Sequence, residues 1–289
     1  MFNSKFVILF IILTAAVIIA TTGAYERIYN SEFADKIRAL FVKPPEVKPF
    51  EGLLDNVTHH SGVNPSTDPL FVAVRAGKPA NYSMLLAGRT PDLVDGTGMT
   101  ALMYASRGDN IDAVKALISA GADINIQDIG GYTALMYGAE TAAAESTDYL
   151  LKHGANLSLK DVKGRTALAI AANNGHNKVL DSVIQWGGVV NDNTIDNVTP
   201  LMMAARNGDT ASVALLIEAG AAVNSRDNSG KMPLIYAAEY GNVEAAKMLV
   251  AAGADIAVRD RGNLSAMAYA RRNSHSEMIN YLASIATPE

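Results

Sequence analysis

A period of 33 residues runs through this chain, and it is plainest where the pentapeptide TALMY at residues 100–104 returns at residues 133–137. Four columns of equivalent residues stay in register, without an insertion, from residue 88 onward. They hold threonine or its substitutes (Thr100, Thr133, Thr166, Thr199, Met232, Ser265), leucine two places later (Leu102, Leu135, Leu168, Leu201, Leu234, with Met267 last), glycine (Gly88, Gly121, Gly154, Gly187, Gly220, Gly253) and aspartate (Asp95, Asp128, Asp161, Asp227, Asp260, with Thr194 as the exception). A sustained period of this length is typical of a solenoid, in which each unit buries its apolar side against its neighbours.

Each column has a physical reason. Threonine caps the free N–H groups at the start of a first helix, and the leucine two places later enters the core. The glycine column marks the end of a second helix, where a residue in the left-handed region closes the helix. Two places before the threonine column the chain has residues that tolerate positive φ in a tight turn, namely Gly98, Gly131, Gly164, Asn197, Gly230 and Asn263. The sequence therefore predicts units of turn, helix, turn, helix.

Three phrases carry a family resemblance: TPLMMAARNGD (199–209), MPLIYAAEYGN (232–242) and AGADIN (120–125). They resemble ankyrin repeats, and the resemblance implies an all-α solenoid of stacked helix pairs with β-hairpin fingers along one edge. We expect this domain at residues 67–289, in about seven units whose first and last are degenerate caps. The family often has histidine at the fourth place of its Thr-Pro-Leu-His phrase. Here that place holds Met103, Met136, Ala169, Met202 and Ile235, so we expect an apolar contact between units.

An uncharged apolar stretch, Phe6–Ala24, comes first. As a helix of roughly 1.5 Å per residue it would come close to spanning a bilayer, so we expect an apolar membrane anchor in residues 1–24. A signal peptide cleaved near Ala24 is the alternative. The short N-terminal tail favours a periplasmic or extracellular location for the remaining chain. The basic residues Arg27, Lys36 and Arg38 favour the opposite, cytoplasmic-facing orientation, and cleavage would give a secreted protein.

Residues 25–66 are expected to form a connecting segment. Several apolar residues lie near helical spacing, which predicts a short amphipathic helix: Tyr29, Phe33, Ile37, Leu40 and Phe41. From residue 43 on, closely spaced prolines favour an extended spacer.

The residues of catalytic and metal sites are missing or isolated. The chain has no cysteine, which removes thiolate metal sites and cysteine nucleophiles. His59 and His60 are adjacent, but no further ligand lies near them in the sequence. A tyrosine column (Tyr104, Tyr137, Tyr236, Tyr269) is expected to pack in the core with its hydroxyls at the rim. A net charge of −5 argues against nucleic-acid binding. We therefore predict no enzyme activity, no cofactor, no metal, no small-molecule substrate and no nucleic-acid partner.

The resemblance also implies a partner surface made of the fingers and the exposed side of the first helices. Carried over to this sequence, that surface comprises Arg107, Ile129, Tyr132, Val162, Lys163, Arg165, Ile195, Asp196, Val198, Arg206, Arg226, Lys231, Glu239, Tyr240, Arg259 and Arg261. Six equivalent places per unit hold ten basic and three acidic residues, which suggests a basic face for an acidic patch on another protein. The alternative is a solvated edge whose charge the aspartate column offsets.

These observations favour a membrane-tethered, non-enzymatic scaffold that binds a protein partner. The alternative is a secreted effector or a toxin-neutralising immunity protein that uses the same surface.

Overall fold

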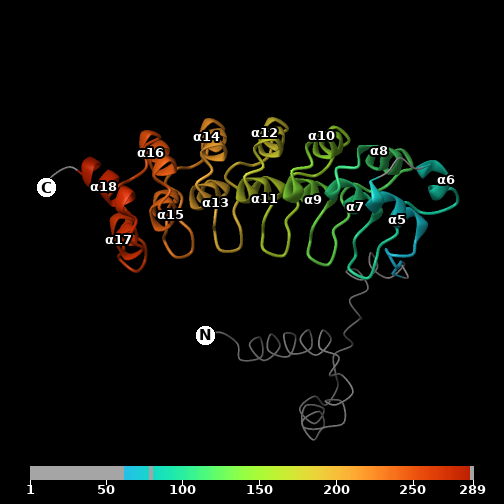
Figure 1. The fold of residues 1–289 in the computed structure, drawn as a ribbon, viewed down its shortest axis with the longest axis horizontal. Coiled ribbons are helices and arrows are strands. Elements are labelled where there is room, and N and C mark those ends of the chain that lie inside the picture. The colour runs from blue at the N-terminus through green and yellow to red at the C-terminus, as the bar shows by residue number, and fades with distance from the viewer. Residues whose placement is uncertain (1–61, 78–80, 287–289) are drawn as a thin grey trace, which may run out of the picture. The chain divides into compact units, whose positions relative to one another are not determined.

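The helices of the repeat region lie in two layers, and turns project beside one of them (Figure 1). The computed structural model describes residues 62–77 and 81–286, which belong to one compact unit. Within these ranges the secondary structure is helical, and extended pairing is limited to isolated bridges. The chain is therefore all-α in the part described, as the sequence predicts.

Seven helix pairs follow one another in the described residues. The first helices form the inner layer: α5 (Pro69–Ala76), α7 (Ala101–Arg107), α9 (Ala134–Thr141), α11 (Ala167–Asn174), α13 (Pro200–Asn207), α15 (Pro233–Tyr240) and α17 (Ala266–Arg272). The second helices form the outer layer: α6 (Tyr82–Leu86), α8 (Ile111–Ser119), α10 (Ala144–Lys152), α12 (Asn177–Gln185), α14 (Thr210–Glu218), α16 (Val243–Ala251) and α18 (Ser276–Ile285). We call the turn before each inner helix from α7 onward a finger.

The predicted helix signals are confirmed. The hydroxyls of Thr100, Thr133, Thr166, Thr199 and Ser265 each accept a hydrogen bond from the N–H three residues later, at 3.2–3.4 Å. Met232 has no hydroxyl, and helix α15 accordingly begins without a side-chain cap. The glycine column has positive φ throughout, as do Asn197 and Asn263 in the fingers.

A single apolar core runs along the array between the layers. Alanines of the inner layer, such as Ala105 and Ala139, are fully buried, and their small size allows neighbouring helices to approach closely. Met103 and Met136 are 1% exposed. The contact between units is therefore apolar at the place where the family often has histidine.

The fingers differ from the predicted β-hairpins. In the finger before α9, the N–H of Asp128 donates to the Tyr132 carbonyl at 3.0 Å, and the N–H of Gly131 donates to Asp128 at 2.9 Å. The chain then enters the helix at once, so no second pair extends the ladder. Among the described residues, antiparallel bridges appear only at Val94–Thr100 and Arg259–Ser265. The first and last fingers are therefore turns closed by one further pair, and the other fingers pass from the turn into the helix without one.

The N-terminal predictions lie outside the described residues. These are the apolar stretch at 6–24, the amphipathic and proline-rich segment up to residue 61, and the adjacent histidines His59 and His60. Among the helices that the structure describes, none is both long and apolar enough to cross a membrane.

Candidate functional site: the finger edge

The aspartate column forms the base of the fingers. In all five aspartates one carboxylate oxygen accepts the N–H of the residue four places later, at 2.8–3.1 Å. Asp161 and Asp227 also accept the N–H two places later, at 2.9 and 2.8 Å. A carboxylate that gathers several N–H groups is a strong local clamp, because hydrogen bonds to a charged acceptor are strong. The aspartates therefore fix the backbone of the five fingers that carry them.

The tyrosine column supplies the second oxygen of these carboxylates with a donor. The hydroxyls of Tyr104, Tyr137, Tyr236 and Tyr269 donate to the aspartate nine residues earlier, at 2.6–2.8 Å. The phenol hydroxyls thus tie each inner helix to its own finger. Burial and the nearby carboxylate both raise the pKa of Tyr137 and Tyr236 above the ordinary tyrosine value.

The two units without tyrosine show that the pairing is systematic. Where Ile170 replaces tyrosine, Arg165 donates through Nε to Asp161 at 2.8 Å. Where Met203 replaces tyrosine, the aspartate itself is replaced by Thr194, whose hydroxyl accepts N–H groups of the finger at 3.1 and 3.3 Å. In these fingers a carboxylate is therefore present only where a side chain donates to its second oxygen, the first being bound by N–H groups of the finger.

Adjacent fingers are joined by a backbone ladder. The N–H of the residue after each aspartate column position donates to a carbonyl of the preceding finger, at 2.9–3.2 Å. These bonds are Ile129 to Thr97, Val162 to Gly130, Ile195 to Lys163, Asn228 to Asp196 and Arg261 to Ser229. The finger edge is thus a continuous hydrogen-bonded border that holds its tips in fixed positions.

Three consecutive fingers carry a large apolar side chain at the tip. Ile129, Val162 and Ile195 are 74%, 69% and 68% exposed, and we call them the tip row. They occupy one repeated position, at which the next two fingers carry Asn228 and Arg261. Three exposed β-branched side chains in register contribute little to the core, which makes the tip row a candidate for an interaction surface.

Several basic residues predicted for the partner surface are bound to the array itself. Arg165 forms an ion pair with Asp161 at 2.7 Å and donates to the Tyr132 hydroxyl at 2.5 Å. Lys231 forms an ion pair with Glu239 at 2.7 Å. Burial alone would lower the pKa of Arg165 and of Lys231, but these partners raise both.

Three more predicted arginines form hydrogen bonds within the array. Arg206 donates to the Asn173 side chain at 2.7 Å, while Arg226 and Arg259 donate to main-chain carbonyls at 2.8–3.0 Å. Lys160, a basic residue of the same edge, pairs with Asp192 at 2.6 Å. The available positive charge is therefore smaller than the sequence count suggests, because carboxylates beside the counted positions offset part of it.

The remaining predicted residues are more accessible. Lys163 and Arg261 are exposed at the tips and have no side-chain hydrogen bond or ion pair among the described residues. Arg107 is exposed and lies over the Tyr137 ring, with 5.8 Å to its centroid. Tyr240 is 54% exposed at the end of α15. Tyr132 and Val198 are half-buried at the base of the fingers, and Asp196 and Glu239 are exposed and half-buried, respectively.

The residues that begin the outer helices bind the inner helix of the preceding unit, a role that the sequence alone did not assign to them. His176 and His275 reach back to the Glu140 and Glu239 carbonyls, at 2.9 and 3.0 Å. Asn242, at the equivalent place, donates to the Ala205 carbonyl at 2.9 Å. The signal was that these three residues share one column of the 33-residue period, in which Asp209 lies between His176 and Asn242. Across the described ranges no group of His, Asp and Glu side chains is arranged to hold a metal ion.

The geometry can be compared with known families. A family model described as ankyrin repeats in three copies matches overlapping segments at residues 50–128, 70–161, 127–194, 168–260 and 201–288. The chain is an ankyrin-repeat protein. No curated protein matches the sequence. Ankyrin repeats generally mediate protein–protein interactions, and the fingers of this ankyrin-repeat protein present the exposed side chains that such a contact needs.

Proposed function

We propose that this ankyrin-repeat protein is a scaffold without catalytic chemistry whose protein partner covers the tip row. The observation that carries the proposal is the exposure of Ile129, Val162 and Ile195 in register on three adjacent fingers. Burying these side chains costs little conformational entropy, because branching at Cβ restricts their rotamers and the backbone ladder has already fixed the main chain. A partner surface with an apolar strip fits this row.

The charges around the tip row suggest which groups border the apolar strip on the partner. Lys163 lies next to Val162, and Arg261 occupies the equivalent tip two fingers beyond Ile195. Both side chains are exposed, so a partner with carboxylates at these places gains ion pairs at the rim of the interface. Rim charges mainly increase the association rate and set salt dependence, while the apolar row supplies the affinity.

We further propose that residues 6–24 tether the array to a membrane, with the array on the periplasmic or extracellular side. Support comes from the uncharged length of this stretch. Intact-mass measurement of the mature N-terminus distinguishes a retained anchor from removal of residues 1–24. Protease accessibility in sealed membranes reports the side on which the array lies.

The decisive experiment is capture of the partner from detergent-solubilised native membranes by the full-length chain. We expect the wild type to retain a stable partner, and the triple variant Ile129→Ser, Val162→Ser, Ile195→Ser to lose it. Met84→Ser, on the equally exposed Met84 of α6, is the matched control and should capture normally. Unfolding should change by no more than about 0.5 kcal/mol per tip, because the side chains are outside the core. Full capture by the triple variant, or no partner for the wild type, contradicts the proposal.

The charge contribution is tested separately with Lys163→Glu and Arg261→Glu. Reversal at these free tips should weaken capture and reduce its salt dependence. Arg165 and Lys231 are unsuitable for this test, since reversing them would break ion pairs that hold the array together.

A further inference from the structure

One unit departs from the repeated pattern on the outer layer. Among the five outer helices from α8 to α16, the residue that ends the helix is alanine or histidine in four (Ala120, His153, Ala219, Ala252) and Trp186 in α12. Trp186 is 51% exposed, and Val189, three residues later, is 56% exposed. The four other units fold without an exposed tryptophan here, so the core does not require it.

The loop after Trp186 also differs from the equivalent loops of the other units. At the place where other units have alanine, it has Gly188, and an added Cβ would lie 2.8 Å from the Val183 carbonyl oxygen. The backbone here follows a path that only glycine allows. Four equivalent residues, Asp123, Asn156, Ala222 and Asp255, donate their N–H groups to a side chain of the preceding unit. At Val189 this hydrogen bond is missing from the described contacts, because the preceding unit offers Ser158 at the matching position.

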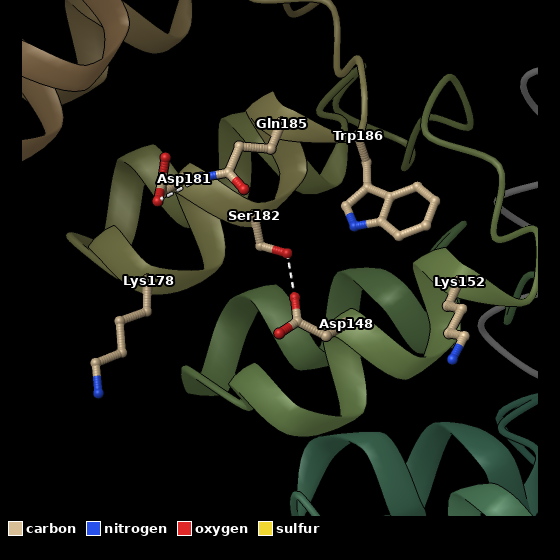
Figure 2. A pocket seen from close by; sticks show the side chains of 7 residues that line it. All are labelled: Asp148, Lys152, Lys178, Asp181, Ser182, Gln185 and Trp186. Atoms are coloured by element: carbon tan, nitrogen blue, oxygen red, sulfur yellow. Dashed lines mark hydrogen bonds between the residues drawn. The ribbon is translucent and has the colours of Figure 1, made fainter.

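A shallow groove of about 480 Å³ lies beside the indole, between α10 and α12 (Figure 2). Asp148 of α10 accepts a hydrogen bond from the Ser182 hydroxyl across the groove floor, and Asp181 accepts one from the Gln185 amide at 2.9 Å. Each carboxylate is thus engaged by one neutral donor of α12 and keeps its negative charge. The indole of Trp186 stands at one end of the groove and Lys178 at the other.

The two lysines of the groove have no such partners. Lys152 and Lys178 are both exposed, and neither forms a hydrogen bond or an ion pair with another described residue. The equivalent residues of α8 and α10 are arranged differently. Tyr149 stacks on His153 with 4.0 Å between ring centroids, and Lys115 lies 6.0 Å from the Tyr149 centroid. Aromatic and cationic groups therefore lie against one another there, whereas Trp186, Lys152 and Lys178 are exposed.

We propose that the α10–α12 groove is a second docking site, separate from the finger edge, which takes an extended acidic segment of a partner protein. An apolar side chain of that segment packs on the Trp186 indole, and its carboxylates pair with Lys152 and Lys178. Tryptophan anchors of this kind supply much of the affinity in protein interfaces. Trp186 and Lys178 are separated by eight residues of helix, or about 12 Å. An extended chain covers this distance in about four residues, so the second carboxylate lies about four positions from the apolar side chain.

The chain contains one tryptophan, so its fluorescence reports this site directly. The test selects ligands for the full-length chain, in detergent micelles, from a displayed library of random dodecapeptides. We expect the selected peptides to combine carboxylates with an apolar residue at the predicted spacing. Their binding should shift the emission of Trp186 to shorter wavelength as the indole leaves water.

Matched variants decide between this site and the finger edge. Trp186→His places the residue of the preceding unit at this position, and Lys178→Glu reverses one cation of the groove. Each should weaken the selected peptides by about tenfold or more, as expected for an anchor residue. Lys163→Glu on a finger should leave their binding unchanged. Peptides that are not acidic, or that bind Trp186→His equally well, overturn the proposal. So does dimerisation of the wild-type chain that Trp186→His abolishes, because the groove would then hold a second copy.

Discussion

The finger edge and the outer layer are built from the same units, but their sequences vary in different ways. At the finger edge the hydrogen-bonding residues repeat, and variation is concentrated at the tips, from Ile129 to Arg261. In the outer layer the repeat holds until Trp186, where one unit loses a bond between units and exposes an indole. Once the role of each repeated position is known, a departure that stability does not explain points to an interaction surface.

The largest loss of stability is expected where a substitution disturbs the close approach of neighbouring fingers. Gly131 has φ of +77°, and an added Cβ would lie 2.9 Å from the Asp161 Cα in the next finger. Gly187, at the end of an outer helix, has φ of +90° and no atom within 4 Å of that position. We expect Gly187→Ala to cost about 1–2 kcal/mol through backbone strain alone, and Gly131→Ala to cost about 1–3 kcal/mol more through the steric contact. Equal losses in urea unfolding would show that the fingers are not closely packed.

The hydrogen bonds of the aspartate column, which we call the finger clamp, should contribute less to the free energy of unfolding than the close approach of the fingers. They should contribute more than any side chain of the tip row. Asp227 accepts two N–H groups and the Tyr236 hydroxyl, so Asp227→Asn should lower the free energy of unfolding by about 2 kcal/mol. Tyr236→Phe, which removes one of these bonds, should cost about 1 kcal/mol. Ile195→Ser serves as the control and should stay within about 0.5 kcal/mol of the wild type. A clamp variant that unfolds like the tip variant would contradict the assigned role.

These contacts show what could be predicted from the sequence. The 33-residue period predicted the helix pairs, their caps and the positive φ at the glycine column, because each depends on local chemistry that recurs at a fixed spacing. The bond from Tyr104 to Asp95 was not predicted, although the nine-residue interval between the two columns recurs in four units. The joint replacement at Thr194 and Met203 was the signal that would have revealed it.

The candidate site was harder to predict than the fold. The sequence placed Ile129, Val162 and Ile195 correctly on the finger edge, but it treated Arg165 and Lys231 as available charges. Their ion pairs with Asp161 and Glu239 depend on how side chains pack around the finger and the inner helix. The groove at Trp186 depends on two helices 33 residues apart, and a single unit examined alone does not show it.

A smaller effect concerns Ala142, one of the non-glycine residues that have positive φ after an inner helix. Ala142 has φ of +62°, where Gly175, Gly208 and Gly241 occupy the same conformation in later units. Ala142→Gly should raise the free energy of unfolding by about 0.5–1 kcal/mol, because relief of the strain exceeds the added flexibility of glycine in the unfolded chain. Gly208→Ala is the reciprocal control and should destabilise, since its Cβ would lie 2.7 Å from Asn242. A loss of stability in Ala142→Gly would refute this explanation.

The smallest effect is local and depends on pH. In Asp95 and Asp260, of the first and last fingers, burial alone would raise the pKa. Hydrogen bonds from Tyr104 or Tyr269, together with other donors, outweigh it and hold both values below the ordinary 3.8. A lowered native pKa stabilises the fold above pH 3.8, and this contribution is lost as pH falls through the native value.

Acid should therefore loosen the two end fingers. The first packs on one side against a degenerate unit, and the last has a neighbouring finger on one side only. Hydrogen exchange between pH 5 and 3 is the measurement, with amides compared after correction for the intrinsic exchange rate. We expect the N–H groups of Met99 and Leu264 to lose more protection than that of Arg165 in the middle of the array. Uniform loss along the array would contradict a local effect of these two carboxylates.

The central claim is that the tip row is the surface that a partner protein covers. Its most direct test places a photo-crosslinking amino acid at position 162, in the full-length chain in native membranes, with a second variant that carries it at the exposed position 112 of α8 as the control. We predict one discrete protein adduct from position 162, absent from position 112 and lost when Ile129 and Ile195 are changed to serine. No adduct at position 162, or the same adducts from both positions, would contradict the account.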